Sequence, residues 1–278
     1  MHFGIALGRM HPSMFVEAAV AADELGYASL WFPEHLVLPG EMAGSPFAGA
    51  DHPPIPPATA VYDVFAYLGF LAARTSRIRL GTHVYNLALR HPFVSARAIQ
   101  TVDVVSGGRL EVGIGAGWLQ AEWLAAGLDF ASRGARLDEA LEVCRRLWTE
   151  EVVEHHGEFF DFDAVMFEPK PIQSPHPPVI IGGESPAALR RASRHDGWIG
   201  LSHTPASVRP AVATLRRLRE ANGRGGAPFS VTIGGPVTDD SDVEAFAAAG
   251  VDRLIVSPWA RTRDVADGLA DFARRFLD

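Results

Sequence analysis

Glu34 and His35 place a carboxyl group beside an imidazole directly after a short apolar run. A histidine in that position could move a proton or hydrogen-bond to a ring atom of a cofactor, with the neighbouring carboxylate orienting it. The same two residues could instead hold the Pro- and Gly-rich segment 36–59 in place. The catalytic and the structural interpretations both stay open from these residues alone.

Gly182, Gly183 and Ser185 form a second candidate site at the end of another apolar run. The two glycines let the backbone approach a ligand closely, and Ser185 followed by Pro186 is a typical helix start. The backbone N–H groups and the dipole of that helix would then face outward, which suits a phosphate. An ordinary capped helix after a turn would carry the same residues.

Gly115, Ala116 and Gly117 end a further apolar run and are followed by Trp118. The segment lacks the GxGxxG spacing and the downstream acidic residue of a Rossmann nucleotide site, so we do not expect one. A flat ring system lying close to the glycine backbone is the better interpretation.

Other chemistries find little support. No HxH or HxxxH pattern joins the ends of the apolar runs, so no metal site is expected. The single cysteine, Cys144, lies in a helical pattern, and there is no GxSxG nucleophile motif. Lys170 is the only lysine and lies away from the ends of the runs, which argues against a Schiff base.

The apolar runs belong to a repeated strand–helix pattern. Because the strands are apolar on both faces, helices should cover a parallel sheet, and eight repeats predict a (β/α)8 TIM barrel of the α/β class. The predicted strands are 2–7, 28–32, 77–84, 109–115, 178–182, 197–201, 229–234 and 252–257. The predicted helices are about 13–25, 60–75, 93–105, 135–150, 186–194, 206–222, 241–249 and 263–277.

Two insertions interrupt the pattern, at 33–59 after the second strand and at 151–177 before the fifth. The latter alternates apolar and polar residues and predicts a short hairpin. Since the strand–helix alternation resumes after each insertion, we expect one domain over residues 1–278. In a barrel the chemistry lies at the carboxyl ends of the strands, which also carry Arg9, Asn86 and Ser202.

Composition narrows the class of protein. The chain has 278 residues, 47% hydrophobic and 21% charged, which suits a large core and excludes disorder. Its net charge of -8 argues against a nucleic-acid partner or an anionic membrane surface. No stretch of 18 uncharged apolar residues and no signal-type segment is present, so we expect a cytoplasmic protein without a membrane partner.

Three long stretches of the sequence resemble a known family. They are RTSRIRLGTHVYNLALRHPFVSARAIQTVDVVSGGRLEVGIGAGW (74–118), RGARLDEALEVCRRLWTE (133–150) and PHPPVIIGGESPAALRRASRHDGWIG (175–200). Together they resemble the luciferase-like monooxygenase superfamily, and within it the actinobacterial branch that uses the deazaflavin coenzyme F420. The resemblance extends from about residue 3 to residue 257.

The resemblance implies a barrel with a flavin-shaped cofactor at its carboxyl-terminal mouth. It also implies a non-prolyl cis peptide bond between His83 and Val84 that places backbone against the central ring of the coenzyme. His35 matches the family histidine near the reactive ring position. The positions that match the ring-flanking segment and the phosphate cradle are Gly115, Ala116 and Gly117, and Gly182, Gly183 and Ser185, respectively.

The function that follows is an F420-dependent oxidoreductase that transfers a hydride between the coenzyme and a small organic substrate. His35 would donate or accept the proton, and Glu34 would orient the His35 ring. The alternative is an FMN-dependent monooxygenase that inserts oxygen, and a further one is a catalytically silent flavin-binding protein. Arg190 and Arg191 are candidate contacts for the longer tail of F420. We also expect a homodimer, as is common in this family.

Overall fold

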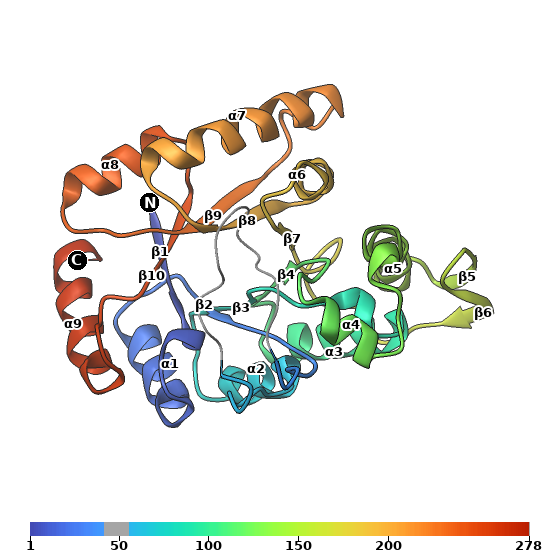
Figure 1. The fold of residues 1–278 in the computed structure, drawn as a ribbon, viewed down its shortest axis with the longest axis horizontal. Coiled ribbons are helices and arrows are strands. Elements are labelled where there is room, and N and C mark those ends of the chain that lie inside the picture. The colour runs from blue at the N-terminus through green and yellow to red at the C-terminus, as the bar shows by residue number, and fades with distance from the viewer. Residues whose placement is uncertain (42–55, 278) are drawn as a thin grey trace.

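Eight parallel strands close into a barrel in the computed structural model, which describes residues 1–41 and 56–277 (Figure 1). Around the barrel the order is β1-β10-β9-β8-β7-β4-β3-β2, so the predicted (β/α)8 fold is confirmed. The barrel strands are β1 (His2–Ala6), β2 (Ser29–Phe32), β3 (Arg79–Thr82), β4 (Leu110–Ile114), β7 (Val179–Gly182), β8 (Gly197–Ser202), β9 (Ser230–Gly234) and β10 (Arg253–Val256).

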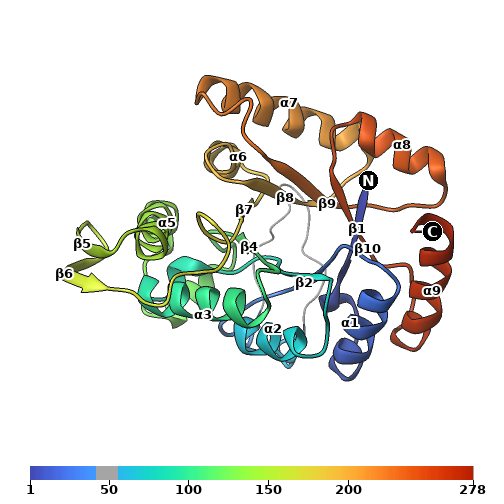
Figure 2. The same cartoon turned by 180° about the vertical axis from the view of Figure 1, so that it is seen from behind.

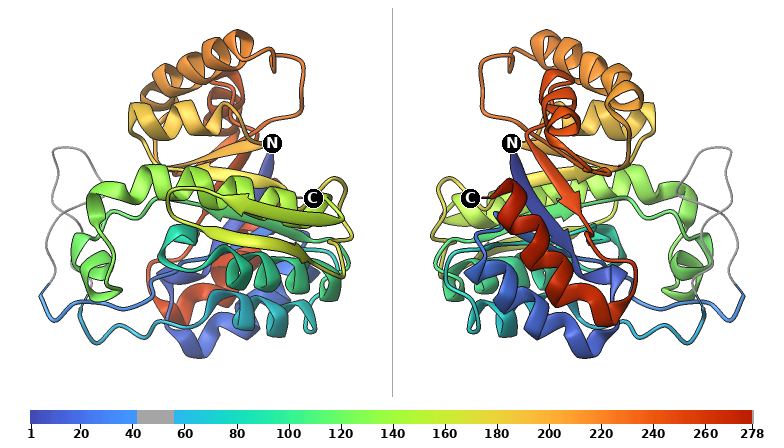
Figure 3. Two further views of the ribbon diagram at one scale, coloured as in Figure 1. Left: turned by 90° about the vertical axis from the view of Figure 1, so that its right-hand side faces the viewer. Right: turned by 90° about the vertical axis from the view of Figure 1, so that its left-hand side faces the viewer.

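Helices surround the strands (Figures 1 and 2). They are α1 (Phe15–Glu24), α2 (Val64–Ala72), α3 (Pro92–Val105), α4 (Gln120–Ala125), α5 (Arg133–Thr149), α6 (Pro186–Ala192), α7 (Pro205–Ala221), α8 (Asp240–Ala248) and α9 (Val265–Phe276). The last helix lies against the first, as the right-hand view of Figure 3 shows. The Phe3 and Phe272 rings, 5.1 Å apart between centroids, pack β1 against α9.

The predicted hairpin before the fifth barrel strand is present. Strands β5 (Val152–His156) and β6 (Asp161–Met166) pair antiparallel and project beyond α5, away from the barrel (Figures 1 and 2). The insertion after the second strand is described only at its two ends, because residues 42–55 lie outside the described chain.

One helix begins later than predicted, and one further helix was not predicted. The helix expected at 60–75 begins only at Val64, because the Asp63 side chain accepts a hydrogen bond from the Ala66 N–H at 2.8 Å and so caps the helix there. A separate short helix, α4, precedes α5, where the sequence pattern indicated no element. This helix turns out to carry part of the site.

One large side chain, Trp31 of β2, fills the middle of the barrel and is fully buried. Glycines on the two neighbouring strands make room for it. A Cβ atom at Gly81 would lie 2.4 Å from the Trp31 ring, and one at Gly4 would lie 3.0 Å from its Nε1 atom. The buried side chains packed with Trp31 are Ile180, Ile199 and Ile255. This layer closes the barrel beneath its carboxyl end.

The amino end of the barrel is closed by an ion cluster. The Glu111 carboxylate accepts hydrogen bonds from the guanidinium groups of Arg79 and Arg253. Burial alone would raise the pKa of Glu111, but the two guanidinium groups outweigh burial and hold that pKa below its usual value. An apolar layer and an ion cluster therefore leave the carboxyl end as the open face of the barrel.

Among the described residues, no helix has the length and apolar character that a membrane span requires.

Candidate functional site

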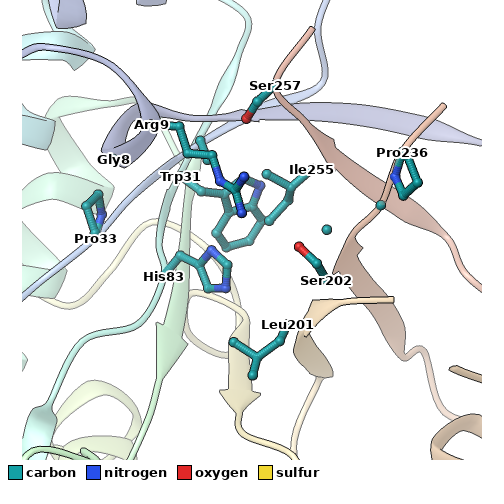
Figure 4. Close-up of a pocket in the computed structure, with 13 residues that line it drawn as sticks. Gly8, Arg9, Trp31, Pro33, His83, Leu201, Ser202, Pro236, Ile255 and Ser257 are labelled. Carbon is teal, nitrogen blue, oxygen red and sulfur yellow. The ribbon is translucent and has the colours of Figure 1, made fainter. Parts of the chain in front are cut away.

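A cavity of about 470 Å³ lies at the carboxyl ends of the barrel strands (Figure 4). Its volume falls in the range of small-molecule sites. Trp31 and Ile255 lie at its base, and its polar side chains are Arg9, His83, Ser202 and Ser257. The described residues that line it are Ala6, Gly8, Arg9, Trp31, Pro33, His83, Leu201, Ser202, Gly234, Gly235, Pro236, Ile255 and Ser257.

His83 is the predicted site residue that lines this cavity. Burial and, to a smaller extent, the nearby Arg9 guanidinium lower its pKa to about 4, although a hydrogen bond with the Gly200 backbone acts in the opposite direction. Its imidazole is therefore neutral at neutral pH. The ring meets Trp31 edge-on, with centroids 6.5 Å apart.

The backbone next to His83 leaves the sheet and returns to it. The His83–Val84 peptide bond is cis, as the resemblance implies. Pairing with β4 resumes at Tyr85, whose N–H donates to the Gly113 carbonyl at 2.7 Å. His83 and Val84 thus form a bulge at the end of β3.

Gly115 and Gly182 lie against the side chain of Val84. A Cβ atom at either glycine would lie 2.6 Å from a Val84 methyl carbon, closer than real contacts allow. These two glycines therefore leave room for Val84, which packs on the Trp31 layer. The sequence indicated glycines that admit a ligand, and the structure shows first that they admit a neighbouring side chain.

His35 is held by a carboxylate, but not by the one predicted. Its Nδ1 atom lies 3.2 Å from Oε2 of Glu122 on α4, and its ring meets Trp118 edge-on at 6.1 Å. Glu122 is buried and also accepts a hydrogen bond from the Leu36 N–H at 2.5 Å. One carboxylate thus fixes both the histidine ring and the start of the loop after β2.

Glu34 points elsewhere, which corrects the expectation that it orients His35. Its carboxylate accepts hydrogen bonds from Arg90 Nη2 at 2.7 Å and from the Asn86 N–H at 2.9 Å. Glu34 and His35 are adjacent in the chain but reach different partners. Glu34 ties the end of β2 to the segment after β3.

Gly117 lies beside a buried donor that lacks a partner among the described residues. It has a positive φ of 75°, and a Cβ there would lie 2.7 Å from Trp123 Nε1, the unpartnered atom, and 3.3 Å from Asn86 Oδ1. Ala116, the residue before it, is partly buried against the core. The segment thus brings a free indole N–H and an amide oxygen to one side of a backbone turn close to His35.

Ser185 caps the start of α6, as predicted, and its hydroxyl accepts from the Ala188 N–H at 3.1 Å. Gly183 is exposed with a positive φ of 110°, and Gly182 ends β7. The Glu184 carboxylate turns toward β8, where it accepts from the Leu201 N–H at 2.8 Å and lies 3.2 Å from His203 Nε2. Its charge is therefore engaged away from the helix start.

Of the two arginines considered for a coenzyme tail, Arg191 is engaged in the fold. It is buried and donates to both carboxylate oxygens of Asp138, at 2.6 and 2.9 Å. Arg190 is exposed.

Sequence reasoning missed the β9 end and did not assign Arg9. Gly234, Gly235 and Pro236 line the cavity, and a Gly-Gly-Pro turn directly after a predicted strand was the available signal. Arg9 was visible as a strand-end residue. Glu122 carried no local signal, because it lies 87 residues from His35.

Comparison with known proteins identifies the family. Residues 2–274 match the model of the luciferase-like monooxygenase family. An uncharacterized protein of Mycobacterium tuberculosis is 32% identical over 271 residues, which are 96% of this chain and 95% of that protein. The FMNH2-dependent dimethylsulfone monooxygenase of Pseudomonas putida is 32% identical over 136 residues, 48% of this chain and 38% of that protein.

A solved structure agrees in fold. The coenzyme F420-dependent tetrahydromethanopterin reductase of Methanopyrus kandleri superposes with a TM-score of 0.79 at 18% identity, covering 99% of this chain and 98% of that one. The family match spans nearly the whole sequence, and the barrel and its strand-3 bulge are what the resemblance implies. The chain therefore belongs to the luciferase-like monooxygenase family.

Proposed function

We propose that the protein is an F420-dependent oxidoreductase that transfers a hydride between the deazaflavin and a small organic substrate. The observation that carries this proposal is His35, whose ring is held by the buried Glu122 beside the mouth of the barrel. Family membership supports a flavin-type coenzyme, and the cavity at the carboxyl ends of the strands offers the space for a reaction.

The residues present fit a flavin-shaped ring. The buried Trp123 Nε1 lacks a partner among the described residues and lies beside Gly117, where a Cβ would intrude. The neutral His83 adds polarity without charge. We propose that the segments 83–84 and 115–117 hold the ring and that Gly182, Gly183 and Ser185 hold the phosphate. The Glu184 carboxylate accepts a hydrogen bond from the Leu201 N–H and lies beside His203, so it points away from that position.

Proton handling then falls to His35. A bound F420 supplies a hydride donor or acceptor at C5, and the protein must supply or remove one proton. Because a carboxylate oxygen accepts, the hydrogen bond to Glu122 places the proton of a neutral imidazole on Nδ1. Nε2 is then the atom that takes a proton from an alcohol or, once protonated, returns it to a carbonyl oxygen.

A competitive titration tests the coenzyme. Purified protein is titrated with F420 and with FMN, each in oxidised and reduced form, and binding is followed by fluorescence. We expect F420 to bind more tightly than FMN. Binding of neither coenzyme would refute the proposal.

The FMN-dependent alternative has one specific observation in its favour, the similarity to the FMNH2-dependent monooxygenase over about half of the chain. Tighter binding of reduced FMN, together with oxygen consumption, would establish it in place of the F420 proposal. Binding of either coenzyme without turnover of any carbonyl or alcohol would indicate the silent alternative.

The homodimer stays a prediction. Helix α2 buries Phe65 and Leu68 but leaves the apolar side chain of Phe70 49% exposed, so this helix is a candidate contact. Sedimentation of the purified protein tests it, and a single monomeric species would exclude it.

A further inference from the structure

The cavity carries a formal charge that the proposed hydride transfer does not use. Arg9 follows β1 and sends its guanidinium into the cavity beside Trp31, with the ring of His83 close by (Figure 4). Arg9 is charged at any physiological pH, and His83 is neutral above about pH 4. The described residues that line the cavity include no Asp or Glu, so the lining has a net charge of one positive unit.

The backbone of Arg9 is fixed while its side chain stays available. The Trp259 indole N–H donates to the Arg9 carbonyl at 3.2 Å, and the preceding Gly8 lies so close to Pro33 that a Cβ would come within 2.7 Å of that ring. Within the described part of the chain, no carboxylate pairs with the Arg9 guanidinium. A fixed base with an unpaired, planar cation is suited to bidentate recognition of a carboxylate.

Topology separates Arg9 from the proposed phosphate position. In the barrel order β1-β10-β9-β8-β7-β4-β3-β2, strand β7 is four positions from β1 in either direction. Arg9 at the end of β1 and Ser185 after β7 therefore face each other across the mouth. A coenzyme whose phosphate lies at Ser185 would leave Arg9 to a different ligand.

We propose that Arg9 is a specificity-determining residue that binds a carboxylate of the substrate, so that the substrate is a carboxylate-bearing ketone or secondary alcohol. This inference rests on the proposed function, because it assigns the opposite side of the mouth to the phosphate of the coenzyme. A monoanion matches the single positive charge of the lining, and Ser202 and Ser257 add two hydroxyl donors to the same cavity.

The experiment compares two small probes of similar size. One is 4-oxopentanoate, which has a ketone and a carboxylate, and the other is 2-pentanone, which lacks the carboxylate. Their binding is measured by ligand-observed NMR, on the protein alone and on the protein saturated with F420. We expect the acid to bind wild-type protein about tenfold or more tightly than the ketone, with added salt weakening the acid only.

Three variants test whether Arg9 causes the preference for the acid. Arg9→Met should abolish the preference for the acid, and Arg9→Lys, which keeps the charge, should retain part of it. Arg209→Met, at an exposed arginine of α7, is the matched control and should leave the preference unchanged. Equal binding of the two probes to wild-type protein, no binding of the acid, or a preference that survives in Arg9→Met would each overturn the proposal.

F420 binding by the Arg9→Met variant shows whether Arg9 binds an anionic group of the substrate or of the coenzyme. If Arg9→Met binds F420 as wild type does, the cation serves the substrate. If it loses F420 binding together with the acid preference, Arg9 binds the coenzyme and the substrate assignment is wrong. A wild-type protein that binds neither F420 nor FMN refutes the proposed function, whereas the acid preference is still decided on the coenzyme-free protein.

Discussion

Gly115→Ala should destabilise the protein by steric conflict with one identified side chain. The new Cβ would lie 2.6 Å from Cγ2 of Val84, and the next atom, Val84 Cβ, would be 3.6 Å away. Gly115 has no positive φ, so the substitution introduces no backbone strain. Overpacking of this kind costs about 1–3 kcal/mol, which lowers Tm by several degrees in a chain of this length.

Val84→Ala should rescue Gly115→Ala. It removes the methyl group in conflict and leaves an ordinary contact of 3.6 Å with the Cβ of Val84. The double variant should therefore be more stable than the sum of the two single effects by about 1–2 kcal/mol. Gly69→Ala is the matched control, because a Cβ there meets nothing within 4 Å and the residue lies within α2. It should stabilise the protein by about 0.5–1 kcal/mol.

The assay is thermal denaturation of the wild-type protein and the four variants, with F420 titration of each. A Gly115→Ala protein as stable as wild type would refute the steric reasoning, and so would a penalty of the same size in the Val84→Ala background. If Gly115→Ala keeps its stability and loses coenzyme binding, the glycine admits the ring itself rather than Val84.

Three further predictions concern titratable side chains. Glu122→Gln should lower kcat by about tenfold or more with little change in KM, because Glu122 acts through His35. Steady-state kinetics with reduced and oxidised coenzyme measure both constants. A change in KM instead of kcat would show that the role of Glu122 is only structural. His83 should make the fold less stable as the pH falls from 6.5 toward 4, because the unfolded chain takes up a proton near 6.5 and the folded chain only near 4. Thermal denaturation across that range should show a weaker pH dependence for His83→Gln, and an identical dependence would contradict the assignment. Lys170→Met should destabilise the protein by about 2 kcal/mol and leave coenzyme binding intact, because Lys170 Nζ donates to three backbone carbonyls at 2.5–3.0 Å. An unchanged Tm would show that water replaces the ammonium group as the donor to these carbonyls.

The architecture was predictable because its signals are local. Buried parallel strands are apolar on both faces, and each is followed by a helical pattern, so eight repeats indicate a closed barrel. The start of α6 was predictable for the same reason, since Ser185 and Pro186 act within one turn of helix. The late start of the helix predicted from residue 60 shows the limit, because the start depends on which of several polar residues caps the helix, and here it is Asp63.

The pairing of side chains at the mouth was not predictable, as the two glutamates show. Glu34 is adjacent to His35 in sequence and serves Arg90, whereas Glu122 is 87 residues away and holds the histidine. Likewise, Gly115 and Gly182 were predicted from the sequence to contact a ligand, whereas in the structure both lie against the side chain of Val84.

The sequence by itself determined the eight barrel strands, the helix that follows each of them and the end of the barrel where chemistry is expected, because each depends on residues a few positions apart. Only the tertiary structure decided which carboxylate meets His35, what the glycines make room for and that Arg9 has no acidic partner among the described cavity residues. Closing the barrel brings strand ends from distant parts of the chain into one mouth, and contacts made by that closure leave no pattern in the local sequence.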